Sequence, residues 1–179
     1  VRIVLAMKNV PYEIVDVKQD DRKSLIAFSG QRKVPTMDYD GQCIIDSTFI
    51  SALLEEKYPE KSIYPKGEAD KALCLMLEDW SDEVLIQANH ALRRAETPEA
   101  RKQGEQLWES HFQNLDHFLK GKKFIFGEIT IADISIFSQL HYLYTVIKQE
   151  VPASYKNLHA WMDLMRRTLN LPSLYDAAA

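Results

Sequence analysis

Residues 33–47 have the sequence KVPTMDYDGQCIIDS, and this stretch decides the fold of the amino-terminal part of the chain. Two short apolar runs, residues 34–37 and 43–45, flank a polar segment that contains Asp40-Gly41. An Asp-Gly pair supplies the positive φ angles that a tight turn between antiparallel strands needs. The stretch therefore predicts a β-hairpin, and the Asp46-Ser47 pair that follows predicts the start of a helix.

The rest of residues 1–58 alternates short helical and extended patterns. Helical spacing of apolar residues predicts helices over residues 1–9, 20–28 and 49–57, and the apolar run over residues 12–17 predicts a strand. Together with the hairpin, the predicted order is helix, strand, helix, strand, strand, helix. We therefore expect a small α+β domain over residues 1–58.

Strand patterns nearly disappear after a predicted linker at residues 59–66, and long helical patterns take their place. Thr97-Pro98-Glu99 combines an N-cap residue, a proline at the first helical position and an acidic first turn, which predicts the start of a long helix. Residues 131–147 are apolar on nearly every side, which predicts a central buried helix. Further helices are predicted over residues 69–87 and 158–169. We expect an all-α helical bundle over residues 67–179.

Composition limits the classes of function. The chain has 179 residues, of which 46% are hydrophobic and 27% charged, as in an ordinary globular protein. No apolar run approaches the roughly 20 residues that span a bilayer, so we expect no membrane association. The net charge of −4 argues against a nucleic-acid partner. Two cysteines suit a reducing, cytoplasmic compartment, and the five histidines lack metal-ligand spacing.

Several ordered motifs together resemble the cytosolic glutathione transferase family over almost the whole chain. The Lys33–Met37 stretch looks like the loop and strand that carry the cis-proline of thioredoxin folds. Asp46-Ser47 precedes a helix that resembles the third helix of that family. The motifs at residues 63–65, 127–133 and 158–162 are similar to its linker, to the cap of its buried helix and to the helix after it. The resemblance implies a thioredoxin-like domain followed by an all-helical domain.

The resemblance also implies a glutathione site made by Lys33, Val34, Pro35, Asp46 and Ser47. A helix N-terminus has unpaired N–H groups and a partial positive charge, so Ser47 would bind the γ-glutamyl carboxylate, and Asp46 would accept from the γ-glutamyl amine. The alternative is that both residues serve only as helix caps.

The Val34–Pro35 bond matters for the same site. Proline pushes the residue before it into an extended conformation. In a cis arrangement, the N–H and C=O of Val34 would turn outward and pair with the cysteine part of glutathione like a short added strand. The alternative is an ordinary proline at the start of a strand. Arg32 and Lys33, with Gln31, would approach the glycyl carboxylate, or would simply be solvated.

Members of the family activate the glutathione thiol with a Ser, Tyr or Cys that follows the first strand. No such residue occurs before Tyr12, and the chain starts at Val1, inside the predicted first helix. We therefore expect the first strand and the catalytic residue, whose identity stays unknown, upstream of Val1. The resemblance implies a homodimeric transferase in which the glutathione thiolate attacks a small electrophilic, largely apolar co-substrate in a cleft against the helical domain, near residues 79–87.

Two alternatives remain open at this point. A Cys as the missing catalytic residue would indicate a glutathione-dependent thiol reductase. A non-catalytic member of the same fold, similar to stringent starvation proteins, would act through protein partners instead. A membrane-inserting chloride channel relative has little support, because the first half of the chain lacks a long apolar segment.

Other polar residues are interpreted as structural. Thr130 and Asp133 have the spacing of a capping box, which predicts a folding role and not catalysis. His141 is predicted to be a hydrogen-bonded core histidine. Cys43 and Cys74 are both predicted to be packing residues.

Overall fold

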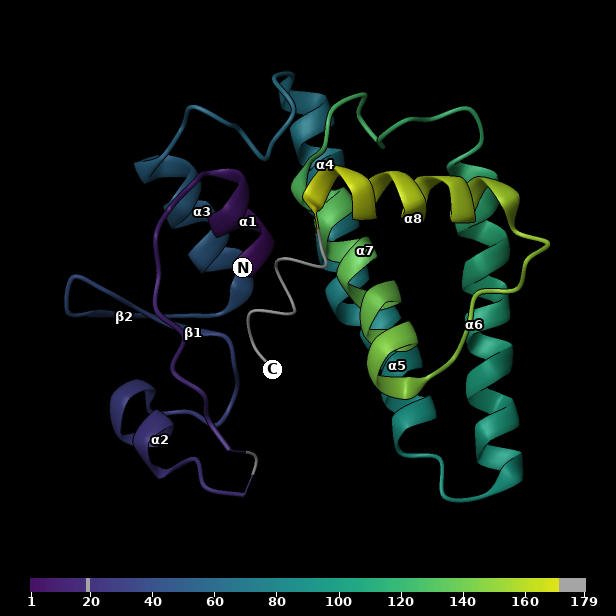
Figure 1. Cartoon of the computed structure of the whole chain (residues 1–179), viewed down its shortest axis with the longest axis horizontal. Coiled ribbons are helices and arrows are strands. Elements are labelled where there is room, and N and C mark those ends of the chain that lie inside the picture. Colours follow the sequence, from purple (N-terminus) through teal and green to yellow (C-terminus); the bar gives the residue numbers. More distant parts are fainter. Residues whose placement is uncertain (19, 171–179) are drawn as a thin grey trace. The chain divides into compact units, whose positions relative to one another are not determined.

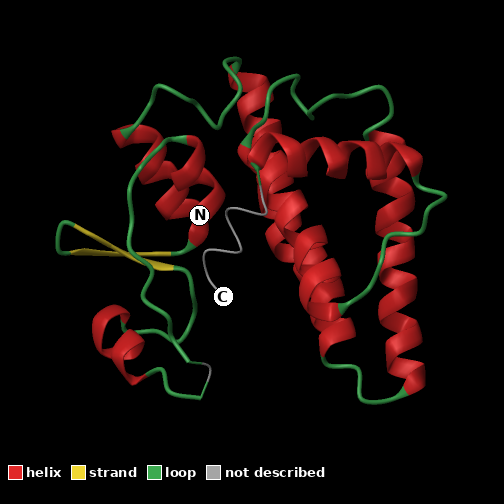
Figure 2. Ribbon diagram, in the orientation of Figure 1, coloured by secondary structure: helices red, strands yellow, loops and turns green. Residues whose placement is uncertain are grey.

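The computed structural model describes residues 1–18 and 20–170 (Figure 1). These residues form two compact units, the first over residues 1–62 and the second from Ile63 onward. The predicted linker at residues 59–66 stays a prediction. The two-stranded sheet lies in the first unit, and the second unit is helical among the described residues (Figure 2). This is the thioredoxin-like plus all-helical architecture that the sequence predicts.

The first unit is built around a hairpin. Strand β1, Thr36–Tyr39, pairs antiparallel with strand β2, Gln42–Ile45. The turn between them contains Asp40 and Gly41, whose φ angles are 51° and 82°. The Gly41 N–H donates to the Asp38 carboxylate at 2.8 Å, which closes the turn. The predicted hairpin is therefore confirmed. Among its described residues, the first unit also contains three helices, α1 (Arg2–Met7), α2 (Lys23–Ser29) and α3 (Ser47–Lys57).

The strand predicted over residues 12–17 is wrong. The described sheet has two strands, β1 and β2, and residues 12–17 add no third one. An apolar run becomes a strand only when a neighbouring strand supplies hydrogen-bond partners, and the described residues offer none here. Ile14 and Val15 are accordingly 47% and 83% exposed.

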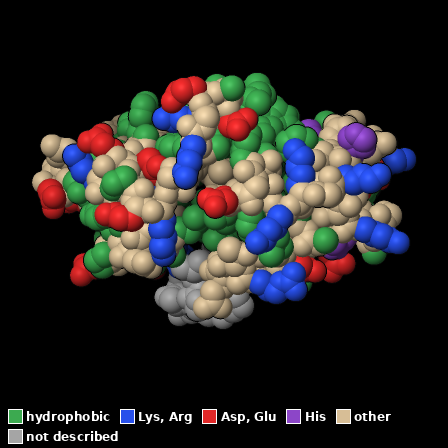
Figure 3. Space-filling model, turned by 90° about the horizontal axis from the view of Figure 1, so that it is seen from above, with side chains coloured by type: hydrophobic (Ala, Val, Ile, Leu, Met, Phe, Trp, Pro, Cys, Tyr) green, Lys and Arg blue, Asp and Glu red, His purple; other side chains and the backbone are tan. Residues whose placement is uncertain are grey.

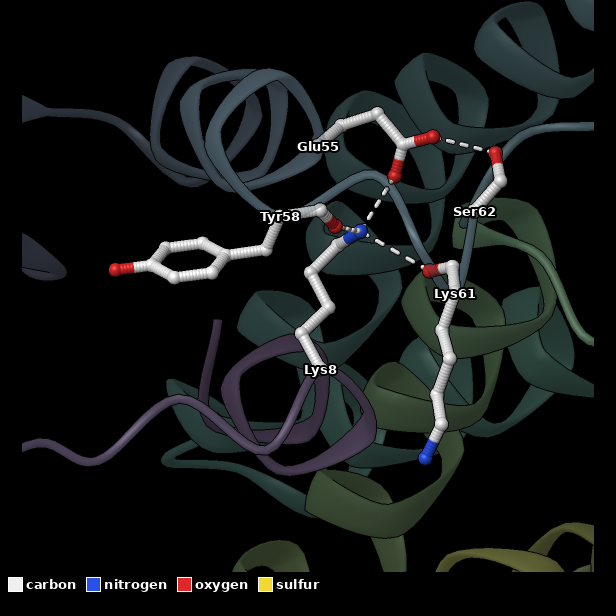
Figure 4. Close-up of polar contacts among 5 residues, drawn as sticks. All are labelled: Lys8, Glu55, Tyr58, Lys61 and Ser62. Atoms are coloured by element: carbon white, nitrogen blue, oxygen red, sulfur yellow. Dashed lines mark hydrogen bonds and ion pairs between the residues drawn. The ribbon is translucent and has the colours of Figure 1, made fainter.

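A buried lysine joins α1 to the end of α3 (Figure 4). The side chain of Lys8 has no solvent exposure, and its Nζ lies 2.7 Å from Glu55 Oε2. The same nitrogen donates to the carbonyl of Tyr58 at 2.6 Å and to that of Lys61 at 3.0 Å. All three ammonium hydrogens therefore have acceptors. The Ser62 hydroxyl donates to the other oxygen of Glu55, so the network also fixes the turn after α3.

The second unit is a bundle in which α7 (Ile131–Tyr142) contacts α4 (Glu68–Trp80) and α5 (Ile86–Arg93). A π-helical turn, η1 (Ser81–Leu85), joins α4 to α5, and a second one, η2 (Leu143–Ile147), follows α7. The remaining helices are α6 (Pro98–Phe118), which packs against α5, and α8 (Lys156–Leu169), which packs against α6. The capped start of α6 at Thr97 is confirmed, because its hydroxyl accepts from Ala100 N–H at 3.1 Å.

The prediction of a buried helix over residues 131–147 is confirmed for α7 and wrong for part of η2. Every residue from Ile131 to Phe137 is buried. Tyr144 and Val146, in η2, are 49% and 55% exposed. A π-helical turn holds an extra residue and so shifts the angular positions of the side chains that follow, which sequence periodicity does not reveal.

The start of α7 carries the predicted capping box. Asp133 is fully buried, and its Oδ2 accepts from the N–H of Thr130 at 3.0 Å and from the Thr130 hydroxyl at 2.9 Å. Its Oδ1 accepts from Ile125 N–H at 3.0 Å and from the Trp161 ring N–H at 3.2 Å. Burial raises the pKa of the Asp133 carboxyl, and these hydrogen bonds oppose that rise.

The two cysteines differ from one another. Cys74 is buried, as predicted, whereas Cys43 is exposed and does not serve as a packing residue. Three of the four residues of its strand, β2, are exposed, so the apolar pattern there does not imply burial on both faces.

Candidate functional site

The hairpin register brings the predicted site residues together. Thr36 of β1 pairs with Ile45 of β2 at the end of the ladder opposite the turn. Pro35 and Asp46 directly continue this last pair, and paired Cα atoms in antiparallel strands lie about 4.5–5.5 Å apart. The Val34-Pro35 and Asp46-Ser47 segments therefore meet at the open end of the hairpin, where α3 begins.

Asp46 is the N-cap of α3. Its Oδ1 accepts from the Thr48 N–H at 2.9 Å. Its backbone has φ 73° and ψ 136°, a region that residues other than glycine rarely occupy. Asp46 is exposed, so its second carboxylate oxygen remains available to a ligand. A strained backbone at the first turn of a helix is typical of a position held in place for binding.

Ser47 is the first residue of α3 and does not cap it. Its hydroxyl makes no hydrogen bond within the described part of the chain. The N–H groups of Ser47 and Phe49 also lack acceptors among residues 1–18 and 20–170. A hydroxyl and two amides without acceptors thus lie in the first turn of an 11-residue helix, at its positive end, which favours an anion. Capping therefore accounts for Asp46 and leaves Ser47 unexplained.

Val34 presents its main chain to solvent. The Val34–Pro35 peptide bond is cis. Val34 is 56% exposed and lies outside the hairpin ladder. Neither its N–H nor its C=O has a hydrogen-bond partner in the part of the chain that the structure describes. One donor and one acceptor, side by side, match the donor and acceptor of a peptide ligand in extended conformation.

Two cations border this main-chain segment. Arg32 and Lys33 are both exposed, and neither side chain has a partner among the described residues. Gln31 is half-buried. The site thus combines positive groups at residues 32–33 with a negative one at Asp46, which suits a ligand that carries charges of both signs.

Sequence reasoning missed the residues that shape the loop before Val34. Arg22 and Thr36 each donate a side-chain hydrogen bond to this loop. Their partners are backbone carbonyls 10 and 3 residues away, and no residue motif marks such contacts. The sequence offered only the general signal that Thr and Arg are donors close to a proline-containing loop.

No set of three or more His, Cys, Asp or Glu side chains within the described residues is placed to hold a metal ion. Among the same residues, no helix is both long and apolar enough to cross a membrane. No described residue of the first unit is assigned to thiol activation.

Two family models match the chain. One, described as "Glutathione S-transferase, N-terminal domain", matches residues 1–62, and the other, "Glutathione S-transferase, C-terminal domain", matches residues 108–165.

Individual relatives agree with these matches. A probable glutathione S-transferase from Nicotiana tabacum is 33% identical over 138 residues, which cover 73% of this chain but only 59% of that protein. A probable maleylacetoacetate isomerase from Caenorhabditis elegans is 33% identical over 152 residues, with coverage of 76% and 69%. The solved structure of a glutathione S-transferase from Methylobacillus flagellatus KT, with GSH bound, has a TM-score of 0.80 at 22% identity, covering 93% of this chain and 87% of that one.

Proposed function

Since the chain belongs to the glutathione S-transferase family, we propose that its first unit binds glutathione and that the whole protein transfers it to an electrophile. The main support for this proposal is a set of three hydrogen-bond donors at the start of α3 that have no acceptor among the described residues. Ser47 has a free hydroxyl, and the amides of Ser47 and Phe49 have no acceptor in the described chain. These three donors fit the γ-glutamyl carboxylate of glutathione.

Residues close to Ser47 would bind the other parts of glutathione. The free N–H and C=O of Val34, next to Pro35, would pair with the main chain of the cysteine part. Asp46 would accept from the γ-glutamyl ammonium group with the carboxylate oxygen that does not cap α3. Lys33 would lie near the glycyl carboxylate. A solved structure of the same fold contains bound GSH, which supports glutathione as the ligand class.

The proposed reaction is thiolate attack. The sulfur of bound glutathione forms a bond to an electrophilic carbon of a small, largely apolar co-substrate, and the electron pair leaves with a departing group or moves onto an activated double bond. Glutathione acts as a co-substrate in this scheme, and no metal takes part.

A second candidate reaction is favoured by one specific observation, the 33% identity to a probable maleylacetoacetate isomerase. A thiolate that adds reversibly to a cis double bond converts it to a single bond, which rotates before the thiolate leaves. Glutathione would then be regenerated and not consumed. Assaying the full-length protein with a conjugation substrate and with a cis-unsaturated diacid distinguishes the two reactions, because only conjugation depletes glutathione.

We also infer that the protein forms a homodimer and that it acts in the cytoplasm. The second unit leaves large apolar side chains exposed, with Leu73 at 48%, Met76 at 57% and Leu107 at 49%. Hydrophobic side chains also reach the surface on the face shown in Figure 3. A second copy would remove such side chains from water. Sedimentation equilibrium tests this proposal, and a monomer at high micromolar concentration would contradict it.

The test of the proposed site is calorimetric titration of glutathione into the full-length protein and into Ser47→Ala. Loss of a hydrogen bond to a carboxylate is worth about 1.5–3 kcal/mol, so the Kd should rise about 10- to 100-fold while the melting temperature stays the same. Ser24→Ala is the matched control, because Ser24 is an exposed serine of α2 without a partner among the described residues. Equal affinity of wild type and Ser47→Ala would remove Ser47 from the site.

A further inference from the structure

The loop between α2 and β1, residues 30–35, has no regular secondary structure, yet side chains hold its backbone. The guanidinium of Arg22, the residue before α2, donates to the carbonyl of Arg32. The hydroxyl of Thr36, the first residue of β1, donates to the carbonyl of Lys33 at 3.3 Å. Two successive carbonyls are therefore fixed by side chains, one from the residue that precedes α2 and one from the first residue of β1.

The beginning of the loop is fixed in a similar way. Gly30 ends α2 with φ 71°, and its N–H donates to the carbonyl of Ile26 at 2.8 Å. The hydroxyl of Ser29 donates to the carbonyl of Leu25 at 2.7 Å and accepts from the N–H of Gln31 at 3.3 Å. Backbone groups at each of residues 30–33 thus have a partner.

Val34 is the exception. Both of its main-chain groups lack a partner in the described chain, although each of the four residues before it has one. Holding a backbone in one conformation before a ligand arrives reduces the conformational entropy lost on binding. A loop that was free to move would lose that entropy when Val34 paired with a ligand.

We propose that Arg22 and Thr36 are positioning residues, which hold residues 32 and 33 so that Val34 presents its free N–H and C=O to the cysteine part of glutathione. This inference rests on the proposed glutathione site and adds two residues that do not touch the ligand. Arg22 acts through the carbonyl of Arg32, and Thr36 acts through that of Lys33.

The test compares Arg22→Met and Thr36→Val with wild type in the full-length protein. Each variant keeps the size of the side chain and removes the donor. We expect the Kd for glutathione to rise about three- to tenfold in each, the range of one lost hydrogen bond, with a less favourable binding entropy and an unchanged melting temperature. Backbone NMR order parameters of residues 32–34 should fall in the free variants. Arg22→Lys and Thr36→Ser keep a donor, so both the Kd and the order parameters should return toward their wild-type values.

Lys23→Met is the matched control, since Lys23 is the exposed neighbour of Arg22 and its side chain has no hydrogen bond or ion pair among the described residues. It removes the same charge and should leave both the Kd and the order parameters unchanged. The double variant Arg22→Met/Thr36→Val should lose less affinity than the sum of the single losses, because both act on one loop.

If the wild-type protein binds glutathione and Arg22→Met and Thr36→Val bind it with the same affinity, this inference is overturned and the proposed function is not. An effect of Lys23→Met equal to that of Arg22→Met would also overturn it, because general charge would then explain the loss. A wild-type protein that binds no glutathione would overturn the proposed function as well.

Discussion

Two helices of this protein have a carboxylate that accepts a hydrogen bond at their amino-terminal end, Asp46 as the N-cap of α3 and Asp133 as the third residue of α7, and the two carboxylates differ in role. Asp133, at the start of α7 in the second unit, is fully buried and accepts four hydrogen bonds. Asp46, at the start of α3 in the first unit, is exposed and accepts one, while Ser47 beside it has a hydroxyl with no partner in the described chain. The same residue types thus complete the fold at one helix and remain open to a ligand at the other.

Removing the buried carboxylate should produce the largest effect. Asp133→Ala leaves two backbone N–H groups and the Trp161 ring N–H buried without their acceptor, so we expect a loss of about 3 kcal/mol or more in the free energy of unfolding. The molecules that remain folded should bind glutathione with wild-type affinity, because Asp133 lies in the second unit. Urea unfolding and calorimetry measure the two quantities. A stable Asp133→Ala protein that fails to bind glutathione would contradict the prediction, because Asp133 would then serve binding and not folding.

The sequence predicts the α7 cap well because its information is local. Thr130 and Asp133 are three residues apart, and the apolar run after them requires burial. The sequence likewise predicts the hairpin turn at Asp40-Gly41. It does not predict the contact of Asp133 with Trp161, which lies 28 residues away.

The candidate site was predicted in a similar, partial way. Asp46 and Ser47 were identified together, but the sequence did not reveal that only Asp46 caps the helix, since both residue types are common caps. The strand over residues 12–17 was predicted wrongly because a strand depends on a partner and not on its own pattern. Arg22 was missed because its acceptor is a backbone carbonyl brought close by the fold.

Changing the exposed carboxylate separates its two roles, and the expected effect is intermediate. Asp46→Asn keeps an acceptor for the Thr48 N–H and tolerates a positive φ, so the free energy of unfolding should change by less than about 0.5 kcal/mol. The γ-glutamyl ammonium group would lose a charged acceptor, and glutathione affinity should fall roughly tenfold. Calorimetric titration and thermal unfolding check both parts.

The control for this change is Asp46→Ala, which removes both roles. It should cost about 1 kcal/mol of stability in addition to the loss of affinity. If Asp46→Asn binds glutathione like wild type, the role of Asp46 is limited to capping α3.

The smallest expected effect is a difference in acid sensitivity between the two units. All five histidines lie in the second unit. Burial lowers the pKa of His111 below its usual value of 6.5, and burial together with Arg166 lowers that of His141. The unfolded chain therefore binds protons first as the pH falls, so stability should be full above about pH 6.5 and decline below it.

This decline in stability should be confined to the second unit, and tryptophan fluorescence can measure it. All three tryptophans lie there, so their fluorescence follows the unfolding of this unit. We expect the midpoint of urea unfolding to fall modestly between pH 7.5 and pH 5.5, and His111→Gln to reduce that fall. His117→Gln, at an exposed histidine, is the matched control. A midpoint independent of pH over this range would contradict the prediction.

The buried Lys8 has a consequence for chemical labelling. Its ammonium group is wholly shielded from solvent and shared among Glu55 and two carbonyls, so an amine-reactive reagent has neither access to the nitrogen nor a free electron pair to attack. Every other lysine in the first unit for which the structure gives an exposure is at least partly open to solvent. Mass-spectrometric detection of a modified Lys8 would therefore count the molecules whose first unit has opened, and so give this unit a reporter to match the tryptophans of the second.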